Sequence, residues 1–197
     1  MSKYKYGENK QITKHFNSKE FQCKCGRNHS IEINDKLIAK LEELYKALNC
    51  SKIIITSGYR CTQHDKAVGG NGSGQHTLGN AADIICYDSK NVPINSKIVC
   101  CVAQDLDFRG IANIDNTYTY THVDVRPTGI WYGDETLGTN TVCMNFYKYY
   151  NLDKSKVYPP MLGGVANGEA VIATQKQMKV TVEYDDHVYS GLLDEQL

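Results

Sequence analysis

The sequence lacks two features that would each point to a class of function. Its 22 Lys and Arg residues equal its 22 Asp and Glu residues, so no net charge steers the chain toward nucleic acid or an anionic membrane. It has no run of about 18 apolar residues, so no transmembrane helix is expected. We therefore expect no nucleic-acid partner and no membrane insertion.

The N-terminus, from Met1 to Lys10, also lacks the apolar region of a secretory signal. In a chain without an export signal, the eight cysteines indicate reduced thiols rather than a disulfide framework. We expect the protein to be made in the cytoplasm. If its target lies outside, another factor must release it.

What the chain does contain is typical of a globular α+β protein. The hydrophobic content is 41% and the charged content 22%, over 197 residues. Apolar residues recur at helical spacing from Asn34 to Leu48 and from Asn95 to Phe108. Three segments are predicted to be strands: Ile53–Thr56, Ala81–Tyr87 and Tyr118–Val125. Strands and helices do not alternate regularly, which predicts a single small domain with a mostly antiparallel sheet flanked by helices.

The C-terminal part is expected to be an appendage. We place the main domain at residues 1–152, and a linker with a C-terminal β-hairpin at 153–197. The linker, 153–170, contains Pro159-Pro160, and alternating residues from Met178 to Leu193 predict the hairpin. Because a lone hairpin is marginally stable, it must pack on the main domain or on another chain. It is a candidate homodimer arm, a wall-binding element or an extra sheet edge.

The N-terminal segment carries one helical turn and a cysteine pair. Residues from Phe16 to Phe21 predict a turn capped by Asn17 or Ser18. A metal site is one interpretation of Cys23-Lys24-Cys25-Gly26 followed by His29. The spacing is wrong for an ordinary zinc knuckle, so two half-buried thiols in a turn is the preferred interpretation.

The stretch from Ala67 to Gly79 is rich in glycine and has no periodicity. It predicts a long loop of the kind that carries function. A phosphate-binding loop is excluded, because the stretch does not end in Gly-Lys-Ser/Thr.

Three residues in and beyond this loop are of the types that a catalytic zinc site uses as ligands. Such a site needs three protein ligands from His and carboxylate, with one position open. His76 closes the loop, Asp83 lies in the following predicted strand, and His122 lies in another strand. We predict one Zn²⁺ per chain on these residues, in a cleft on the sheet.

Further polar residues surround the predicted ligands. Asp124 shares a strand face with His122, and is either the general base or a carboxylate that orients His122; we favour the base. Arg60 is predicted to bind a substrate carboxylate or the oxyanion, with a structural loop arginine as the alternative. Tyr120 lies on the same strand face and is predicted to bind substrate. Ser73 and Gln75 either bind substrate backbone or hold the loop.

Four motifs in order resemble a known family. They are Ser57-Gly58-Tyr59-Arg60, Ala67-Val68-Gly69-Gly70, Ser73-Gly74-Gln75-His76 with Gly79-x-Ala81-x-Asp83, and His122-Val123-Asp124-Val125-Arg126. Together they resemble the zinc D-alanyl-D-alanine carboxypeptidases. That family includes phage endolysins that cut the L-alanyl-D-glutamate bond and the dipeptidases of vancomycin resistance.

The resemblance implies zinc on His76, Asp83 and His122, with Arg60 assisting the tetrahedral intermediate and a peptidoglycan stem peptide as substrate. Several members carry a catalytic acid three residues before the last ligand, where this chain has Thr119. The first hypothesis is a bacteriolytic phage or prophage endolysin, acting on the cell wall after release. The alternatives are a D-Ala-D-Ala carboxypeptidase or dipeptidase of cell-wall metabolism, and an inactive wall-binding relative.

Overall fold

A computed structural model describes residues 1–137, 141–142, 144–157, 181–184 and 187–190. The chain divides into two compact units, Met1–Cys143 and Met144–Leu197. No helix in the described ranges is long and apolar enough to cross a membrane.

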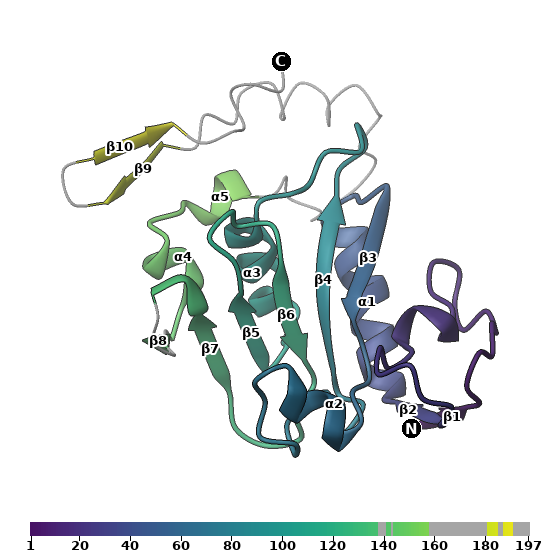
Figure 1. Cartoon of the computed structure of the whole chain (residues 1–197). Coiled ribbons are helices and arrows are strands. Elements are labelled where there is room, and N and C mark those ends of the chain that lie inside the picture. The colour runs from purple at the N-terminus through teal and green to yellow at the C-terminus, as the bar shows by residue number, and fades with distance from the viewer. Residues whose placement is uncertain (138–140, 143, 158–180, 185–186, 191–197) are drawn as a thin grey trace. The chain divides into compact units, whose positions relative to one another are not determined.

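The first unit is built on a six-stranded sheet (Figure 1). In spatial order its strands are β3 (Lys52–Ser57), β4 (Ala81–Tyr87), β6 (Thr121–Asp124), β5 (Gly110–Asn113), β7 (Trp131–Asp134) and β8 (Thr141–Val142). Neighbouring strands are antiparallel except for the parallel pair β5–β7. The predicted α+β class with a mostly antiparallel sheet is therefore confirmed.

Two longer helices lie behind the sheet in Figure 1. α1 (Asp35–Ala47) begins after Asn34, whose side chain accepts a hydrogen bond from the Lys36 amide. α3 (Ser96–Asp105) begins after Asn95, which caps it in the same way through the Lys97 amide. The two predicted helices are confirmed, although α3 ends before the predicted Phe108, because Asp107 adopts a left-handed backbone (φ 58°).

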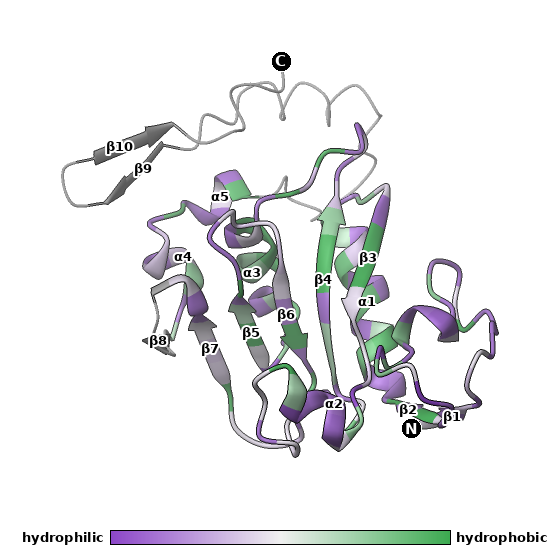
Figure 2. Ribbon diagram, in the orientation of Figure 1, coloured by the Kyte–Doolittle hydropathy of each residue, from purple (hydrophilic) through white to green (hydrophobic). Residues whose placement is uncertain are grey.

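The core lies where these helices cover the sheet. The buried residues of α1 are Leu37, Ile38, Leu41 and Leu44, which is the stripe expected from helical spacing. β4 is buried along almost its whole length, and Figure 2 shows β3 and β4 as predominantly hydrophobic. A strand enclosed on both faces holds its polar residues in a fixed place, which matters for Asp83.

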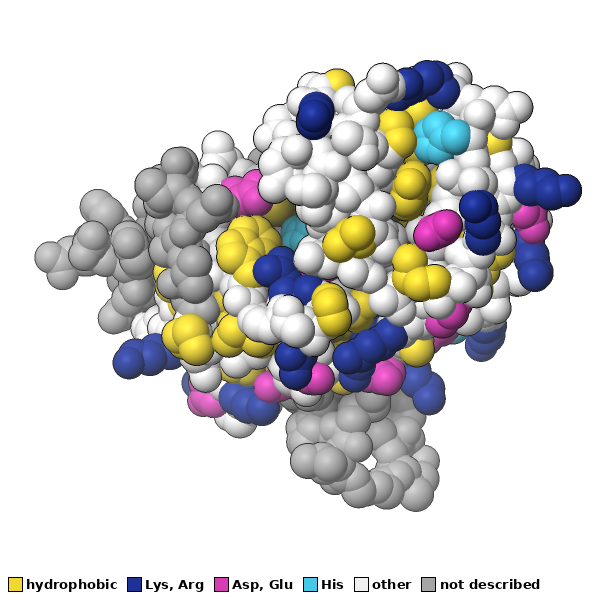
Figure 3. All heavy atoms as spheres, turned by 90° about the horizontal axis from the view of Figure 1, so that it is seen from below, with side chains coloured by type: hydrophobic (Ala, Val, Ile, Leu, Met, Phe, Trp, Pro, Cys, Tyr) yellow, Lys and Arg dark blue, Asp and Glu magenta, His cyan; other side chains and the backbone are white. Residues whose placement is uncertain are grey.

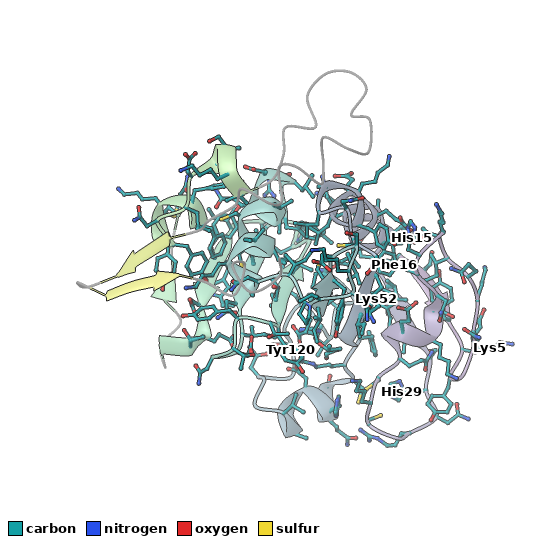
Figure 4. The ribbon with its side chains drawn as sticks, turned by 90° about the horizontal axis from the view of Figure 1, so that it is seen from above. Lys5, His15, Phe16, His29, Lys52 and Tyr120 are labelled. Atoms are coloured by element: carbon teal, nitrogen blue, oxygen red, sulfur yellow. The ribbon has the colours of Figure 1, made fainter. Side chains whose placement is uncertain are left out.

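The N-terminal segment contains a pair of strands that was not predicted. β1 (Ser2–Tyr4) and β2 (Ile31–Ile33) form a separate antiparallel pair. The predicted turn is a 3-10 helix, η1 (Ser18–Phe21), and Asn17 caps it. His15 stacks on Tyr45 of α1, with ring centroids 3.8 Å apart, and Figure 4 labels His15 and Phe16 where this segment meets that helix.

Two local predictions differ from the structure. A short helix, α2 (Thr62–Ala67), precedes the glycine-rich loop and was not predicted; its few residues are too short for a helical period to show. The strand predicted from Tyr118 begins only at Thr121, because Tyr118 has a left-handed backbone (φ 53°) and Asp115 closes a turn onto the amides of Thr119 and Tyr120. A second 3-10 helix, η2 (Glu135–Leu137), follows β7.

The second unit contains α4 (Phe146–Tyr149) and α5 (Lys154–Val157). Within the predicted appendage, β9 (Thr181–Tyr184) and β10 (His187–Ser190) pair antiparallel. Most of the predicted linker, the Asp185-Asp186 turn and the last residues lie outside the described ranges. The domain boundary at 152/153 and the homodimer arm stay predictions.

Candidate metal centre

The sheet brings two of the predicted ligands face to face. β4 and β6 pair so that Asp83 lies directly opposite His122. His76 comes from the loop after α2, and the Arg60 amide donates to its carbonyl oxygen at 3.2 Å. A bulge in β3 between Ile55 and Ser57 places Ser57 beside Asp83. The strands therefore fix two ligands, and the loop supplies the third.

The three donor atoms form a compact triangle. His122 Nδ1 lies 2.9 Å from Asp83 Oδ1, His76 Nε2 lies 3.2 Å from the same oxygen, and the two nitrogens are 3.3 Å apart. Ligand atoms on a tetrahedral zinc with bonds of about 2.0–2.1 Å lie about 3.3 Å apart. The donor set and its spacing therefore fit a zinc ion with one position left for another ligand.

In both histidines, the ring nitrogen that does not face Asp83 contacts an oxygen of the surrounding chain. His76 Nδ1 lies 2.7 Å from the Gly58 carbonyl oxygen, and His122 Nε2 lies 3.3 Å from Asp124 Oδ2. A metal-binding histidine usually donates its other N–H to a carbonyl or carboxylate, which sets the tautomer and the ring orientation. This pattern turns one nitrogen of each ring toward Asp83.

The electrostatics also suit a cation. Burial disfavours charge on Asp83, but hydrogen bonds with His122 and His76 outweigh it and hold the pKa of that carboxyl well below its usual range. Burial alone would lower the pKa of His122, but hydrogen bonds with Asp124 and Asp83 raise it to about 9. The centre thus holds ionised carboxylates and stabilises positive charge.

Asp124 lies behind His122. Its side chain is fully buried, and Arg126 binds it through both the side chain and the backbone amide. It contacts Nε2 of His122, whereas Nδ1 of that ring faces Asp83 and His76. These contacts favour the orienting role over the base role that the sequence favoured.

Arg60 contacts Asp83. Its Nη2 lies 2.5 Å from Asp83 Oδ2, its Nε donates to Ser57 Oγ at 2.8 Å, and its Nη1 lies 3.6 Å from Asp65 Oδ1. The guanidinium thus holds the Asp83 oxygen that does not face the histidines. The predicted role of Arg60 toward substrate stays a prediction.

Ser73, Gln75 and Tyr120 make contacts within the scaffold. Ser73 binds Asn71 within the loop, and Gln75 Oε1 accepts from Asn80 at 2.9 Å. These bonds correspond to the loop-holding alternative. Tyr120 precedes β6 with an exposed ring, and Figure 4 labels it on that loop. Their substrate-binding roles stay predictions.

Two further residues near the centre were missed as site residues. The ring of Trp131, at the start of β7, stands edge-on to His122 with centroids 5.7 Å apart. Glu135 follows β7; burial of its carboxyl raises its pKa, and the charges of His122, Asp83 and Arg60 act on it. In the face shown in Figure 3, a histidine side chain lies recessed in a hollow among hydrophobic and basic side chains.

The family model for peptidase M15 matches residues 14–124, more than half of the chain. The chain belongs to the peptidase M15 family. The matched range contains His76, Asp83 and His122, and the site they form fits the zinc of M15 enzymes. No curated protein matches the chain. M15 peptidases generally cleave cell-wall peptides, so the substrate class is a peptide.

Proposed function

We propose that this M15 protein is a zinc-dependent peptidase that hydrolyses a peptide bond within the stem peptide of bacterial peptidoglycan. The observation that carries the proposal is the triangle of His76, Asp83 and His122, with donor atoms 2.9–3.3 Å apart, within the M15 range. The phage origin and the release to the wall stay predictions from the sequence.

In this mechanism the chain holds its three ligands in place and keeps the Asp83 carboxylate ionised. Zinc bound there would supply Lewis-acid activation of the scissile carbonyl and of the attacking water. Arg60 binds Asp83 Oδ2, so that Oδ1 stays beside both histidines. The Gly58 carbonyl orients the His76 ring, and the Asp124 carboxylate orients the His122 ring.

Hydrolysis also needs a group that accepts a proton from the attacking water. Asp124 is an unsuitable candidate, because it is fully buried and both its oxygens are bound to Arg126. We assign this role to Glu135, the first residue of η2, which solvent reaches although its carboxyl is partly buried. It lies close enough for the charges at the centre to act on it. Its raised pKa suits a carboxylate that must gain a proton.

The proposal is tested on purified peptidoglycan. Wild-type protein loaded with Zn²⁺ is expected to release soluble muropeptides with new amino termini inside the stem, identified by mass spectrometry. His76→Ala should abolish release, whereas the matched control His64→Ala, on α2 and outside the donor triangle, should retain it.

Two outcomes would change the assignment. Release of free D-alanine without new internal termini would indicate a carboxypeptidase. Equal release by His76→Ala and wild type would refute the proposed centre.

A further inference from the structure

A second cluster of metal-binding side chains lies outside the centre described above. It consists of Cys23, Cys25, His29 and Cys61, and one donor atom from each lies within 4.8 Å of all the others. The first three come from the segment between η1 and β2, and Cys61 immediately precedes α2. The spacing of Cys23, Cys25 and His29 alone argued against a metal site. The fourth residue of the cluster, Cys61, lies 38 residues from Cys23 in the sequence and was not considered with them.

The histidine of this cluster is set to coordinate a metal. His29 Nε2 lies 3.0 Å from Cys25 Sγ, while Nδ1 lies 3.0 Å from the Ser30 carbonyl oxygen. A bond from Nδ1–H to that carbonyl leaves the Nε2 lone pair facing the sulfurs, as in many zinc-bound histidines. Figure 4 labels His29, and sulfur atoms lie beside its ring.

The sulfurs are held by N–H donors of the surrounding chain. The Cys61 amide donates to Cys23 Sγ at 3.3 Å, and the Arg27 amide donates to Cys25 Sγ at 3.4 Å. Arg27 also reaches Cys61 Sγ through Nη2 at 3.3 Å. Such donors stabilise negative charge on sulfur, and the thiolate is the form that binds metal.

A disulfide or a catalytic thiol would use only part of this cluster. Cys23, Cys25 and Cys61 are all free, and a disulfide between any two would leave the third thiol and His29 without a role. A Cys25–His29 nucleophile pair would leave the other two sulfurs unused. Three thiols and one imidazole converging on one point are the ligand set of a closed, structural zinc site.

We propose that Cys23, Cys25, His29 and Cys61 bind a second zinc ion, with four protein ligands and no open position. Tetrahedral zinc–sulfur bonds of about 2.3 Å place sulfurs about 3.8 Å apart. The four donor atoms of the cluster already lie within 4.8 Å of one another. This site differs from the first centre, which contains no sulfur and three protein ligands.

The position of the site indicates what the ion does. It ties the N-terminal segment to the chain just after β3, where Gly58 and Arg60 support the ligands His76 and Asp83. The two segments already meet there: the Tyr59 amide donates to the Phe21 carbonyl at 3.0 Å, and a Cβ at Gly58 would lie 2.6 Å from Phe21 Cα. The second zinc therefore fixes the support of the first centre.

The test uses Co²⁺ as the probe, because thiolate ligands give cobalt a charge-transfer absorption in the near ultraviolet that His and Asp ligands do not. The full chain, stripped of metal under reducing conditions and titrated with Co²⁺, is expected to show this absorption. His76→Ala should keep it, and Cys25→Ser should lose it. The matched control Cys50→Ser, a buried thiol outside the cluster, should keep it.

Two further measurements remove any dependence on the folding of one variant. His29→Cys, which retains four ligands, should keep the absorption and strengthen it. In the wild-type chain, Zn²⁺ should protect Cys23, Cys25 and Cys61 from alkylation, and a chelator should expose them. Cobalt binding without thiolate absorption in wild type, or equal alkylation with and without zinc, would overturn the second site and leave the peptidase proposal untouched.

Discussion

Asp83 and His122 lie opposite each other on neighbouring antiparallel strands, and their side chains meet at 2.9 Å between Oδ1 and Nδ1. Cross-strand partners keep a short, fixed separation, so this pair does not depend on loop conformation. His76, by contrast, reaches the pair from a loop, and the Gly58 carbonyl holds its ring. The centre therefore combines two rigid ligands with one that the loop positions.

Replacing the carboxylate of this pair is expected to remove the metal. Asp83→Asn keeps the shape of the side chain but loses the charge that both histidines and Arg60 contact. We expect loss of zinc from the first centre and of peptidoglycan hydrolysis, with the fold retained. Metal analysis and circular dichroism of the same sample check this. Wild-type zinc content in the variant would contradict it.

Asp124→Asn separates the two roles considered for that residue. If Asp124 orients His122, zinc affinity should fall by about 10–100-fold, because that is the usual loss when the partner of a metal-bound histidine is removed. If it were the base, affinity would hold and only turnover would collapse. Competition with a chelator of known affinity measures the first quantity. The structure leads us to expect the fall in affinity.

The sequence predicted those parts of this centre that depend on residue type and on position along a strand. His76, Asp83 and His122 were predictable because ligand type and number, together with positions on strands, restrict a zinc site strongly. The position of Asp124 on the His122 face was also predictable from strand alternation, and the two side chains do meet. Which ring nitrogen of His122 faces the other ligands depends on a side-chain rotation that no spacing encodes.

Contacts between residues far apart in the sequence could not be predicted either, because they depend on how the chain folds back on itself. The contact of Arg60 with Asp83 was not predicted, because it accompanies a bulge in β3 that a β-branched run does not reveal. Cys61 joins Cys23 only because the chain after β3 passes the N-terminal segment. Helix α1, whose signal is a local repeat, was predicted almost residue for residue.

Glu135→Gln tests the proposed proton acceptor. Loss of a general base typically lowers turnover by about 10²–10⁴-fold, so kcat should fall within that range while zinc content stays at the wild-type level. Glu135→Asp should recover part of the activity. An unchanged kcat for Glu135→Gln would exclude the residue as the base. Thr136→Ala, at the neighbouring position of η2, serves as the matched control.

Zinc should also stabilise the folded chain. A ligand that binds only the folded state adds about 2.7 kcal/mol to the free energy of unfolding when its free concentration is about 100 times its Kd. We expect Tm to rise on addition of Zn²⁺ and to fall with a chelator, by calorimetry. His76→Ala should retain only part of the rise. A Tm independent of zinc in the wild type would contradict both metal sites.

Gly110→Ala is expected to disturb the centre without touching a ligand. Gly110 pairs with Asp124 across β5 and β6, and a Cβ there would collide with the Asp124 carboxylate. Because Asp124 is fully buried and bound to Arg126 and His122, it has no free space to enter. Overpacking of this kind costs about 1–3 kcal/mol, and displacement of Asp124 should weaken zinc binding as well.

Gly129→Ala is the control for backbone strain alone. Gly129 lies in a loop with a left-handed backbone (φ 70°), and an added Cβ there meets nothing within 4 Å. Lower stability in both variants, with weaker zinc binding only in Gly110→Ala, is the expected result, measured by thermal unfolding and chelator competition.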